Sequence, residues 1–335
     1  MEERRLDLQQ LRRLRISPRA WFFCHGSFEE RCLTIPSALR ERKLGKVIVF
    51  KNDDVGSKGD DNTKHIIGEF LDAQMVILDK NQPLTTMDRF SETLSPAELT
   101  DVPQIVVDIT CFTRESLLLF FRILTYRIPD HTQITVLYSV ASSYASHRKG
   151  PGAWLSRGVS AIRPVAGYSG EFISSKSTNL IVLTGFEIDR LSTIFEEIEP
   201  AGITFLRSEN TREEPASISK FRTSFLYSSG RRFGNIDEYF FDAYSVSSVL
   251  QILSFIYIKN IDKVNIVAPL STKLSTLAVG LFGLIQENVQ IMYVKPAVYN
   301  KNRYSEISDD IRLFNFTLNE LEHYLSEQTP LAATT

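Results

Sequence analysis

The sequence predicts an α/β protein built from two Rossmann-like halves, each a mostly parallel sheet flanked by helices. Short apolar runs alternate with amphipathic stretches along the chain, which is the pattern of βαβ units. The chain has 335 residues, 43% of them hydrophobic, and at about 100–200 residues per domain this suffices for two cores. The alternation restarts after a segment rich in Ser, Gly, Pro and Arg, so we expect an N-terminal domain at 1–172 and a C-terminal domain at 173–335.

In the first half, apolar runs predict strands at 20–24, 46–50, 74–78, 104–109 and 133–138. Amphipathic or apolar stretches predict helices at 28–42, at 62–71, near Pro96 and at 114–126. Pro36 is expected to delay or kink the first of these helices. Residues 142–170 are expected to be largely irregular.

In the second half, strands are expected at 179–184, 203–206, 263–268 and 289–294. Helices are expected at 188–198, 245–258, 274–284 and 311–325. Residues 207–236 are polar and are expected to hold a helix and an exposed loop. The unit Val264–Leu284 repeats the layout of Ile105–Tyr126, which indicates a duplication of architecture without a sequence repeat.

The net charge of the chain does not indicate which class of partner it binds. The formal net charge is −2, so there is no strong nucleic-acid signal apart from a basic N-terminus, which is where we would first look for a protein partner. No apolar run reaches the roughly 18 residues that span a bilayer, and no signal-peptide core precedes the domain. We therefore expect a cytoplasmic protein without membrane contact.

The sequence names neither a metal nor a cofactor. The cysteines Cys24, Cys32 and Cys111 are odd in number and lack paired metal-ligand spacing, which favours a reducing compartment and no metal site. Walker A, G-x-G-x-x-G, H-E-x-x-H and C-x-x-C motifs are absent, so the cofactor stays unknown.

The turn at 269–273 is the best phosphate candidate. In an open α/β sheet, ligands bind at the carboxyl ends of strands, where helix N-termini favour phosphate. Ser271 and Thr272 offer hydroxyl groups there, and Lys273 offers a positive charge. The alternative is that Ser271 caps the helix and Lys273 is solvated.

The turn at 108–114 is the corresponding candidate in the first half. Asp108 ends an apolar strand and is costly to bury without a partner, and Arg114 at the helix start can pair with it or with a ligand. Thr110 lies between them. The alternative is a structural Asp–Arg pair in which Thr110 or Thr113 caps the helix.

The segment 24–31 holds most of the reactive side chains. Cys24 and His25 are adjacent on a strand and point to opposite faces, which argues against a catalytic pair. Glu29 or Glu30 is the acid to suspect if the chain hydrolyses a glycosidic bond. Ser27 is a ligand candidate, although its spacing to Glu30 is that of a capping box.

Three further residues complete the candidates. Glu187 begins a predicted helix after a strand, where a carboxylate also suits the helix dipole. Tyr299 and Tyr304 lie among cations and amides after the last strand, a composition that can stack and hydrogen-bond a nucleobase. A packed loop is the alternative for the two tyrosines.

The strand, Ser/Thr-Lys turn and helix at Val264–Leu284 resemble the ligand-binding motif of CARF and SAVED sensor domains, in which a Gly-Thr-Lys-type turn meets a cyclic oligonucleotide. The turn from Asp108 to Arg114 resembles a diverged copy, and SAVED proteins carry two such units. The resemblance implies that Thr272 and Lys273 contact phosphate or base, with Thr110 and Arg114 in the equivalent place. It covers two turns, the usual glycines are missing here, and no effector domain is recognisable.

The leading hypothesis is a tandem Rossmann-like protein that binds a nucleotide or cyclic oligonucleotide, as a sensor or accessory subunit of a bacterial antiviral defence system. If the sheets pack as a pseudo-dimer, the two turns would line one pocket. The first alternative is a hydrolase of nucleotide N-glycosidic bonds, because residues 21–27 followed by acids resemble the opening of TIR-like or nucleoside-deoxyribosyltransferase-like domains. The second is a non-catalytic structural subunit. Whether the chain is an enzyme stays open.

Overall fold

A computed structural model describes residues 1–145, 154–171, 173–185, 190–209, 224, 236–301 and 304–328. The chain divides into two compact units: unit 1 contains Met1–Tyr144 and Lys301–His323, and unit 2 contains Ala145–Asn300 and Tyr324–Thr335. These units differ from the continuous halves 1–172 and 173–335 in two ways: unit 2 already begins at Ala145, and the segment Lys301–His323 returns to unit 1. Which bounds mark an independently folding domain stays a prediction.

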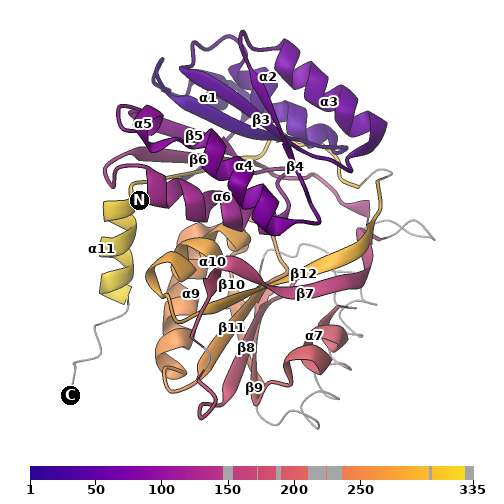
Figure 1. The fold of residues 1–335 in the computed structure, drawn as a ribbon, viewed down its shortest axis with the longest axis vertical. Coiled ribbons are helices and arrows are strands. Elements are labelled where there is room, and N and C mark those ends of the chain that lie inside the picture. Colours follow the sequence, from indigo (N-terminus) through magenta and orange to yellow (C-terminus); the bar gives the residue numbers. More distant parts are fainter. Residues whose placement is uncertain are drawn as a thin grey trace. The chain divides into compact units, whose positions relative to one another are not determined.

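Unit 1 is built on a seven-stranded sheet of order β1-β13-β6-β5-β2-β3-β4 (Figure 1). Its strands are β1 (Glu2–Leu6), β2 (Trp21–Gly26), β3 (Lys46–Asn52), β4 (Gln74–Leu78), β5 (Gln104–Asp108), β6 (Gln133–Ser139) and β13 (Ile311–Phe316). Its helices are α1 (Leu8–Arg13), the short 3-10 helix η1 (Glu30–Leu33), α2 (Thr34–Leu39), α3 (Gly56–Gly68), α4 (Pro83–Thr93), α5 (Pro96–Leu99) and α6 (Arg114–Arg127). Helix α11 (Leu318–Gln328) begins in unit 1 and ends in unit 2.

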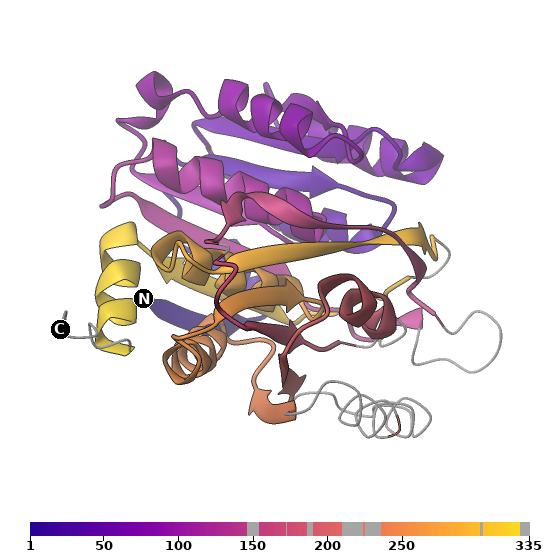
Figure 2. The same cartoon turned by 60° about the horizontal axis from the view of Figure 1, so that its bottom comes forward.

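Unit 2 is built on a six-stranded sheet of order β10-β9-β8-β11-β12-β7. Its strands are β7 (Ser156–Ser169), β8 (Thr178–Leu183), β9 (Gly202–Ser208), β10 (Ile236–Phe241), β11 (Val264–Pro269) and β12 (Gln290–Tyr299). Its described helices are α7 (Leu191–Ile198), α9 (Val246–Lys259) and α10 (Lys273–Ile285). Figure 2 shows β12 running beside β7, with which it pairs in the antiparallel direction.

The two sheets share one topology. In unit 1 the chain passes from β2 outward to β3 and β4, then crosses back to β5 and β6 on the other side of β2. Unit 2 repeats this path with β8, β9 and β10 on one side and β11 and β12 on the other. In each unit an antiparallel strand pairs with the last parallel strand: β13 follows in the chain and pairs with β6, whereas β7 precedes its unit's parallel strands and pairs with β12. The predicted fold class, two mostly parallel sheets flanked by helices, is confirmed.

Alternating side chains of the central strands build a core on both faces of the unit 1 sheet. Phe23 of β2 lies on one face, where its ring centroid is 5.2 Å from that of Phe120 on α6. Phe22 and Cys24 point to the other face of the sheet, where they pack in an apolar cluster that includes Ile35 of α2 and Ile66 of α3. Helices thus cover both faces, as the near-continuous apolar strands require.

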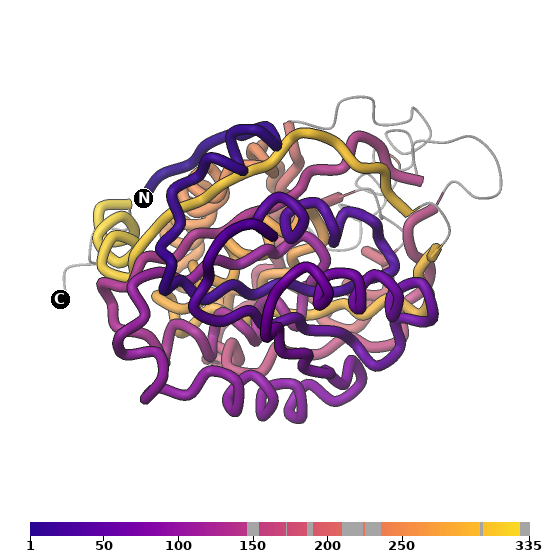
Figure 3. Tube along the Cα trace, turned by 90° about the horizontal axis from the view of Figure 1, so that it is seen from above, coloured from indigo at the N-terminus to yellow at the C-terminus, as the bar shows by residue number. Residues whose placement is uncertain are grey.

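Four strands were not expected from the sequence, and the first of them is β10, which pairs with β9 in the parallel direction. The helix predicted at 311–325 is wrong in its first part, because Ile311–Phe316 forms β13 between β1 and β6, and the helix begins only at Leu318. The basic N-terminal segment begins with β1, which lies beside β13 in Figure 3. The largely irregular segment expected at 142–170 contains β7, a strand of 14 residues.

Candidate functional site

Each unit has one topological switch point, where the chain changes direction across the sheet. In unit 1 it lies between β2 and β5, and in unit 2 between β8 and β11. Loops that follow these strands flank the crevice in which open α/β sheets bind ligands. The predicted turns 24–31 and 108–114 therefore meet at the first switch point, and the turns 184–187 and 269–273 follow the two strands of the second.

The helices that leave the two switch points begin in the same way. Thr113 is the N-cap of α6: its Oγ1 accepts from the Ser116 backbone N–H at 3.1 Å, and Ser116 Oγ donates to the Thr113 carbonyl at 3.1 Å. Thr272 is the N-cap of α10 and repeats both bonds with Ser275, at 3.1 and 2.9 Å. The shared sequence is Thr-cation-x-Ser, which we call the paired helix start.

The paired helix start places one cation in each unit at the first helical position. Arg114 and Lys273 are half-buried there, beside the positive end of the helix dipole and its unpaired N–H groups. The cap of α10 is Thr272 and not Ser271, and Thr272 Oγ1 also donates to the carbonyl of Ala243 at 2.6 Å. Both arrangements suit an anion that approaches the helix end.

The residue of unit 1 that corresponds to Thr272 is Thr113, whereas the resemblance placed Thr110 in that role. Thr110 is buried, and its Oγ1 accepts from the Ser139 N–H at 3.0 Å. Its own N–H donates to Asp108 Oδ1 at 2.9 Å. Thr110 therefore holds β5 and β6 together behind the switch point, while Thr113 occupies the helix start.

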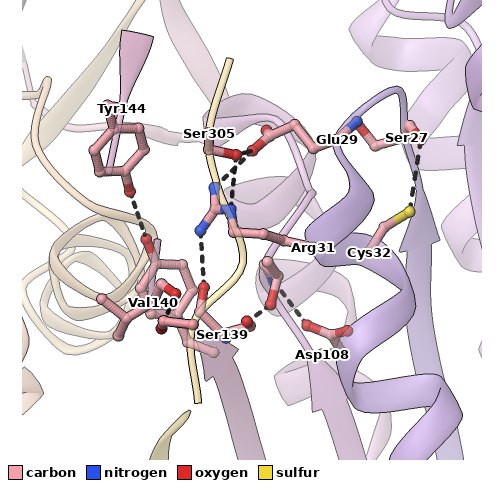
Figure 4. Close-up of polar contacts among 12 residues, drawn as sticks. Ser27, Glu29, Arg31, Cys32, Asp108, Ser139, Val140, Tyr144 and Ser305 are labelled. Atoms are coloured by element: carbon pink, nitrogen blue, oxygen red, sulfur yellow. Dashed lines mark hydrogen bonds and ion pairs between the residues drawn. The ribbon is translucent and has the colours of Figure 1, made fainter. Parts of the chain in front are cut away.

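A buried arginine lies in the segment that follows β2, beside the first switch point. Figure 4 shows Arg31, which leaves η1 and lies among Glu29, Ser139 and Ser305. Arg31 Nη2 donates to Glu29 Oε2 at 2.6 Å, Nε to Ser305 Oγ at 2.9 Å and Nη1 to the Ser139 carbonyl at 2.8 Å. Ser305 Oγ donates to the same Glu29 oxygen at 2.7 Å. We call these four residues the Arg31 cluster.

Asp108 and Glu29, the two acids near Arg31, differ in their electrostatic surroundings. Burial raises the pKa of Asp108 to about 7, while hydrogen bonds from Thr110 and the charge of Arg31 act in the opposite direction. Burial alone would lower the pKa of Arg31, but Glu29 and the nearby Tyr144 and Tyr138 hold it well above its ordinary value. Arg31 is therefore charged, and Glu29 is its counter-ion.

The two suspected acids and Ser27 have different surroundings. Glu29 lies in the Arg31 cluster with a side chain that is 10% exposed, whereas Glu30 is exposed and accepts from Lys58 Nζ at 2.9 Å. Ser27 is buried, and its Oγ accepts from the Glu29 N–H at 3.3 Å. The expected capping box of Ser27 and Glu30 is wrong, because Glu29 is the N-cap of η1 and makes no side-chain cap bond.

Aromatic side chains lie at the rim of the first switch point. Tyr304 packs edge-on against Phe28, with ring centroids 5.7 Å apart, and against Tyr144 at 6.5 Å. Tyr144 also lies 5.6 Å from the Arg31 guanidinium. All three rings are half-buried. Tyr299 is at the end of β12 in unit 2, so the two tyrosines predicted to stack a base belong to different units.

In unit 2 the strands approach closely at the switch point. A Cβ atom at Gly185 would stand 2.6 Å from the Leu270 carbonyl oxygen, so only glycine fits between the ends of β8 and β11. Arg190, just before α7, is buried and donates to Ser156 Oγ on β7. The candidate Glu187 lies outside the described residues.

The described residues offer little for metal or thiol chemistry. They contain no group of three or more His, Cys, Asp or Glu side chains able to hold a metal ion. The three cysteines are free and buried, and burial raises the pKa of the Cys24 and Cys111 thiols, which makes them poor nucleophiles. In the same part of the chain, no helix is long and apolar enough to cross a membrane.

No protein-family model matches the sequence, and no curated protein matches it. The fold is similar to that of a type III CRISPR defence DNA nuclease activated by cyclic oligoadenylate, with a TM-score of 0.50 and 8% identity. The match covers 82% of this chain and 65% of the nuclease, so the chain spans less than two thirds of its length. At this identity, the likeness shows a shared fold alone.

Two further solved structures are much less similar. Mitomycin 7-O-methyltransferase MmcR matches with a TM-score of 0.25 and 10% identity, over 44% of this chain and 39% of its own. The cytoplasmic domain of a prokaryotic cation chloride cotransporter matches with a TM-score of 0.26 and 8% identity, over 85% and 97%. Neither likeness bears on function.

Sequence reasoning selected the turns at the strand ends but missed the buried arginine beside the first switch point. The shared pocket expected for the turns 108–114 and 269–273 stays a prediction. Arg31 was counted among the reactive side chains of segment 24–31 but was given no role of its own. Its partners Ser139 and Ser305 lie 108 and 274 positions away in the chain, and no local pattern signals such contacts. Thr113 and Ser116 could have been predicted from the sequence, because the spacing Thr-Arg-x-Ser at 113–116 repeats Thr-Lys-x-Ser at 272–275.

Proposed function

We propose that this chain binds a nucleotide-class ligand, a nucleotide or a cyclic oligonucleotide, through the cations of its paired helix start. Arg114 in unit 1 and Lys273 in unit 2 are the phosphate-binding side chains. The protein then serves as a sensor or accessory subunit of a bacterial antiviral defence system.

The paired helix start carries this proposal. Two helices with the same cap, the same hydrogen bonds and a cation at the same position leave the two places where this topology binds ligands. A single capped helix start is common for local reasons, but its repetition at both switch points favours a shared ligand chemistry. The fold shared with a nuclease activated by cyclic oligoadenylate suggests which nucleotides to test first.

Calorimetric titration with a panel of mononucleotides, dinucleotides and cyclic oligoadenylates tests the proposal. We expect at least one ligand to bind the wild-type chain, and the Lys273→Ala variant to bind it about tenfold or more weakly, because a charge-assisted bond to phosphate is lost. Lys176→Ala removes an exposed lysine of unit 2 and is the matched control. The absence of any binding that Lys273→Ala weakens would contradict the proposal.

The hydrolase alternative has less support. A general acid must give up a proton to a leaving group, whereas Glu29 is held by Arg31 and Ser305 and Glu30 lies in an exposed ion pair. Incubation with NAD and nucleosides, followed by product analysis, tests it. Turnover that is abolished by Glu29→Gln would favour the hydrolase, and its absence with partners present would exclude it. Co-purification with neighbouring gene products tests the structural-subunit alternative.

A further inference from the structure

The outermost strands of the two sheets differ in how they are protected. An edge strand offers unpaired backbone groups to another chain, and proteins usually block such edges with charged residues, prolines or irregular geometry. Strand β1 carries Glu2, Glu3, Arg4 and Arg5; β10 carries Asp237 and Glu238; β7 carries Arg157, Arg163 and Pro164. Strand β4, with the sequence Gln-Met-Val-Ile-Leu, carries none of these.

The unprotected strand also presents apolar side chains to solvent. Met75 and Ile77 are both 48% exposed, and they lie on the same face of β4 because they are two residues apart. Val76, on the other face, is half-buried, and Leu78 is buried. Strand β4 is the last strand of its sheet in the described part of the chain, with β3 on its inner side.

The hydrogen bonding of β4 shows which backbone groups point outward. The Leu78 carbonyl accepts from the Asp53 N–H, so Leu78 directs its backbone toward β3. The N–H and C=O of a strand residue point to the same side, and successive residues alternate. Met75 and Ile77 therefore direct their N–H and C=O groups away from the sheet, toward any strand that adds to the edge.

We propose that two copies of this chain pair through β4 in the antiparallel direction, about a twofold axis at Val76. In this register Met75 of one copy lies opposite Ile77 of the other, and each such pair exchanges both of its outward-facing backbone hydrogen bonds. The exposed apolar side chains then cover each other as cross-strand neighbours. The two seven-stranded sheets become one continuous sheet, joined by an isologous contact.

Charge selects this register over its neighbours. Pairing about Val76 sets Asp72, which is exposed, opposite Lys80 of the other copy, and it does so at both ends of the contact. Lys80 already holds Asp54 at 2.7 Å, so it forms a bridge between two carboxylates. Pairing about Met75 or Ile77 sets Asp72 opposite Leu78 or Gln82 instead, and neither can pair with the charge.

Sedimentation of the full chain over a range of concentrations tests the pairing. We expect a mass twice that of the monomer at micromolar concentrations. Ile77→Pro removes an outward N–H without touching the bonds to β3, and should raise the dimer dissociation constant by about tenfold or more. Met75→Lys tests the same edge through its side chain, in case the proline disturbs folding. Leu84→Lys, at a residue that is 68% exposed outside β4, should leave the mass unchanged.

Cysteine cross-linking tests the register. At Val76 the two copies form a non-hydrogen-bonded pair with Cα atoms about 4.5 Å apart, which a disulfide can bridge. Val76→Cys should therefore give a covalent dimer on mild oxidation. In the matched variant Met75→Cys, the two thiols are diagonal neighbours about 7–8 Å apart between Cα atoms, and no covalent dimer should form.

Three results would overturn the proposal: a monomeric wild-type chain at about 100 µM, a concentration at which even a weak isologous contact is populated; a dimer that both Ile77→Pro and Met75→Lys leave unchanged; or faster cross-linking of Met75→Cys than of Val76→Cys. The contact is separate from the helix starts that the proposed function uses. Loss of dimerisation with ligand binding intact, or the reverse, therefore tells the two proposals apart.

Discussion

At the scale of single residues, Asp108 links burial to pH. It is buried at the first switch point, where desolvation raises its pKa from 3.8 to about 7. Between these values the folded chain holds a proton that the unfolded chain has lost. The free energy of unfolding therefore falls as the pH rises from about 4 to about 7, by up to about 4 kcal/mol, and this loss is fully present above pH 7.

The variant Asp108→Asn removes this dependence. Its Oδ1 can still accept from the Thr110 N–H, but no charge has to be buried. We expect the variant to be more stable than the wild type by about 1–3 kcal/mol at pH 8, and to gain little at pH 4.5. Urea unfolding at both pH values measures this, with the exposed Asp61→Asn as the control. A variant that is less stable than the wild type at pH 8 would contradict the pKa of about 7.

Variants of the Arg31 cluster test whether its buried ion pair stabilises the region around the first switch point. Arg31→Met leaves the Glu29 carboxylate buried without its main counter-charge, and we expect a loss of about 3–5 kcal/mol in the free energy of unfolding. The double variant Arg31→Met/Glu29→Gln should recover part of this loss. If the single variant loses less than about 1 kcal/mol, or if the two effects add, the pair is not coupled as the contacts imply.

Asp108 and Arg31 show which residues of this site the sequence could predict and which it could not. Asp108 was predictable as a costly buried acid, because it ends a strand of Ile and Val. Its neighbour Arg31 was not, because the partners that hold it come from the ends of β6 and from the segment before β13. Long-range packing decides such a position, and the residues around Arg31 in the sequence fit an ordinary helix face equally well.

At the scale of elements, the paired helix start makes a quantitative prediction. Thr113→Ala and Thr272→Ala each remove a cap, which is worth about 1 kcal/mol. The loss should be greater at Thr272, because its Oγ1 also donates to the Ala243 carbonyl at 2.6 Å, and Thr→Ser should restore most of the stability at both positions. Thermal unfolding of the four variants measures this. Equal losses at the two caps would show that the Ala243 bond contributes nothing.

Most parallel strands could be predicted because they are buried on both faces and are rich in Val, Ile and Phe. The strands that were missed lie at or near an edge, and all of them except β10 are antiparallel. β1 and β7 carry charges, Pro or Gly that protect an edge but hide the strand from sequence patterns. The residues of β13 were predicted as part of a helix because the helical repeat of Leu318, Leu321 and Leu325 follows them directly.

At the scale of the whole molecule, the C-terminal segment Lys301–His323 completes unit 1. Strand β13 stands between β1 and β6, so a chain that ends at Asn300 loses the partner of β1 and bares the edge of β6. We expect this truncation to abolish the unfolding transition of unit 1 while unit 2 still melts, as read by calorimetry. Survival of both transitions would show that β13 contributes little and would favour the continuous halves 1–172 and 173–335.

The central claim is that the helix start at each of the two switch points binds phosphate of a nucleotide-class ligand. Titration calorimetry of the double variant Arg114→Ala/Lys273→Ala against the double control Arg40→Ala/Lys176→Ala, with the tightest ligand of the panel, tests it most directly. Both controls replace exposed cations. We predict that the first variant loses about tenfold or more in affinity at each helix start, since a charge-assisted contact is removed there, while the control binds like the wild type. Equal affinity of the two variants would contradict the claim.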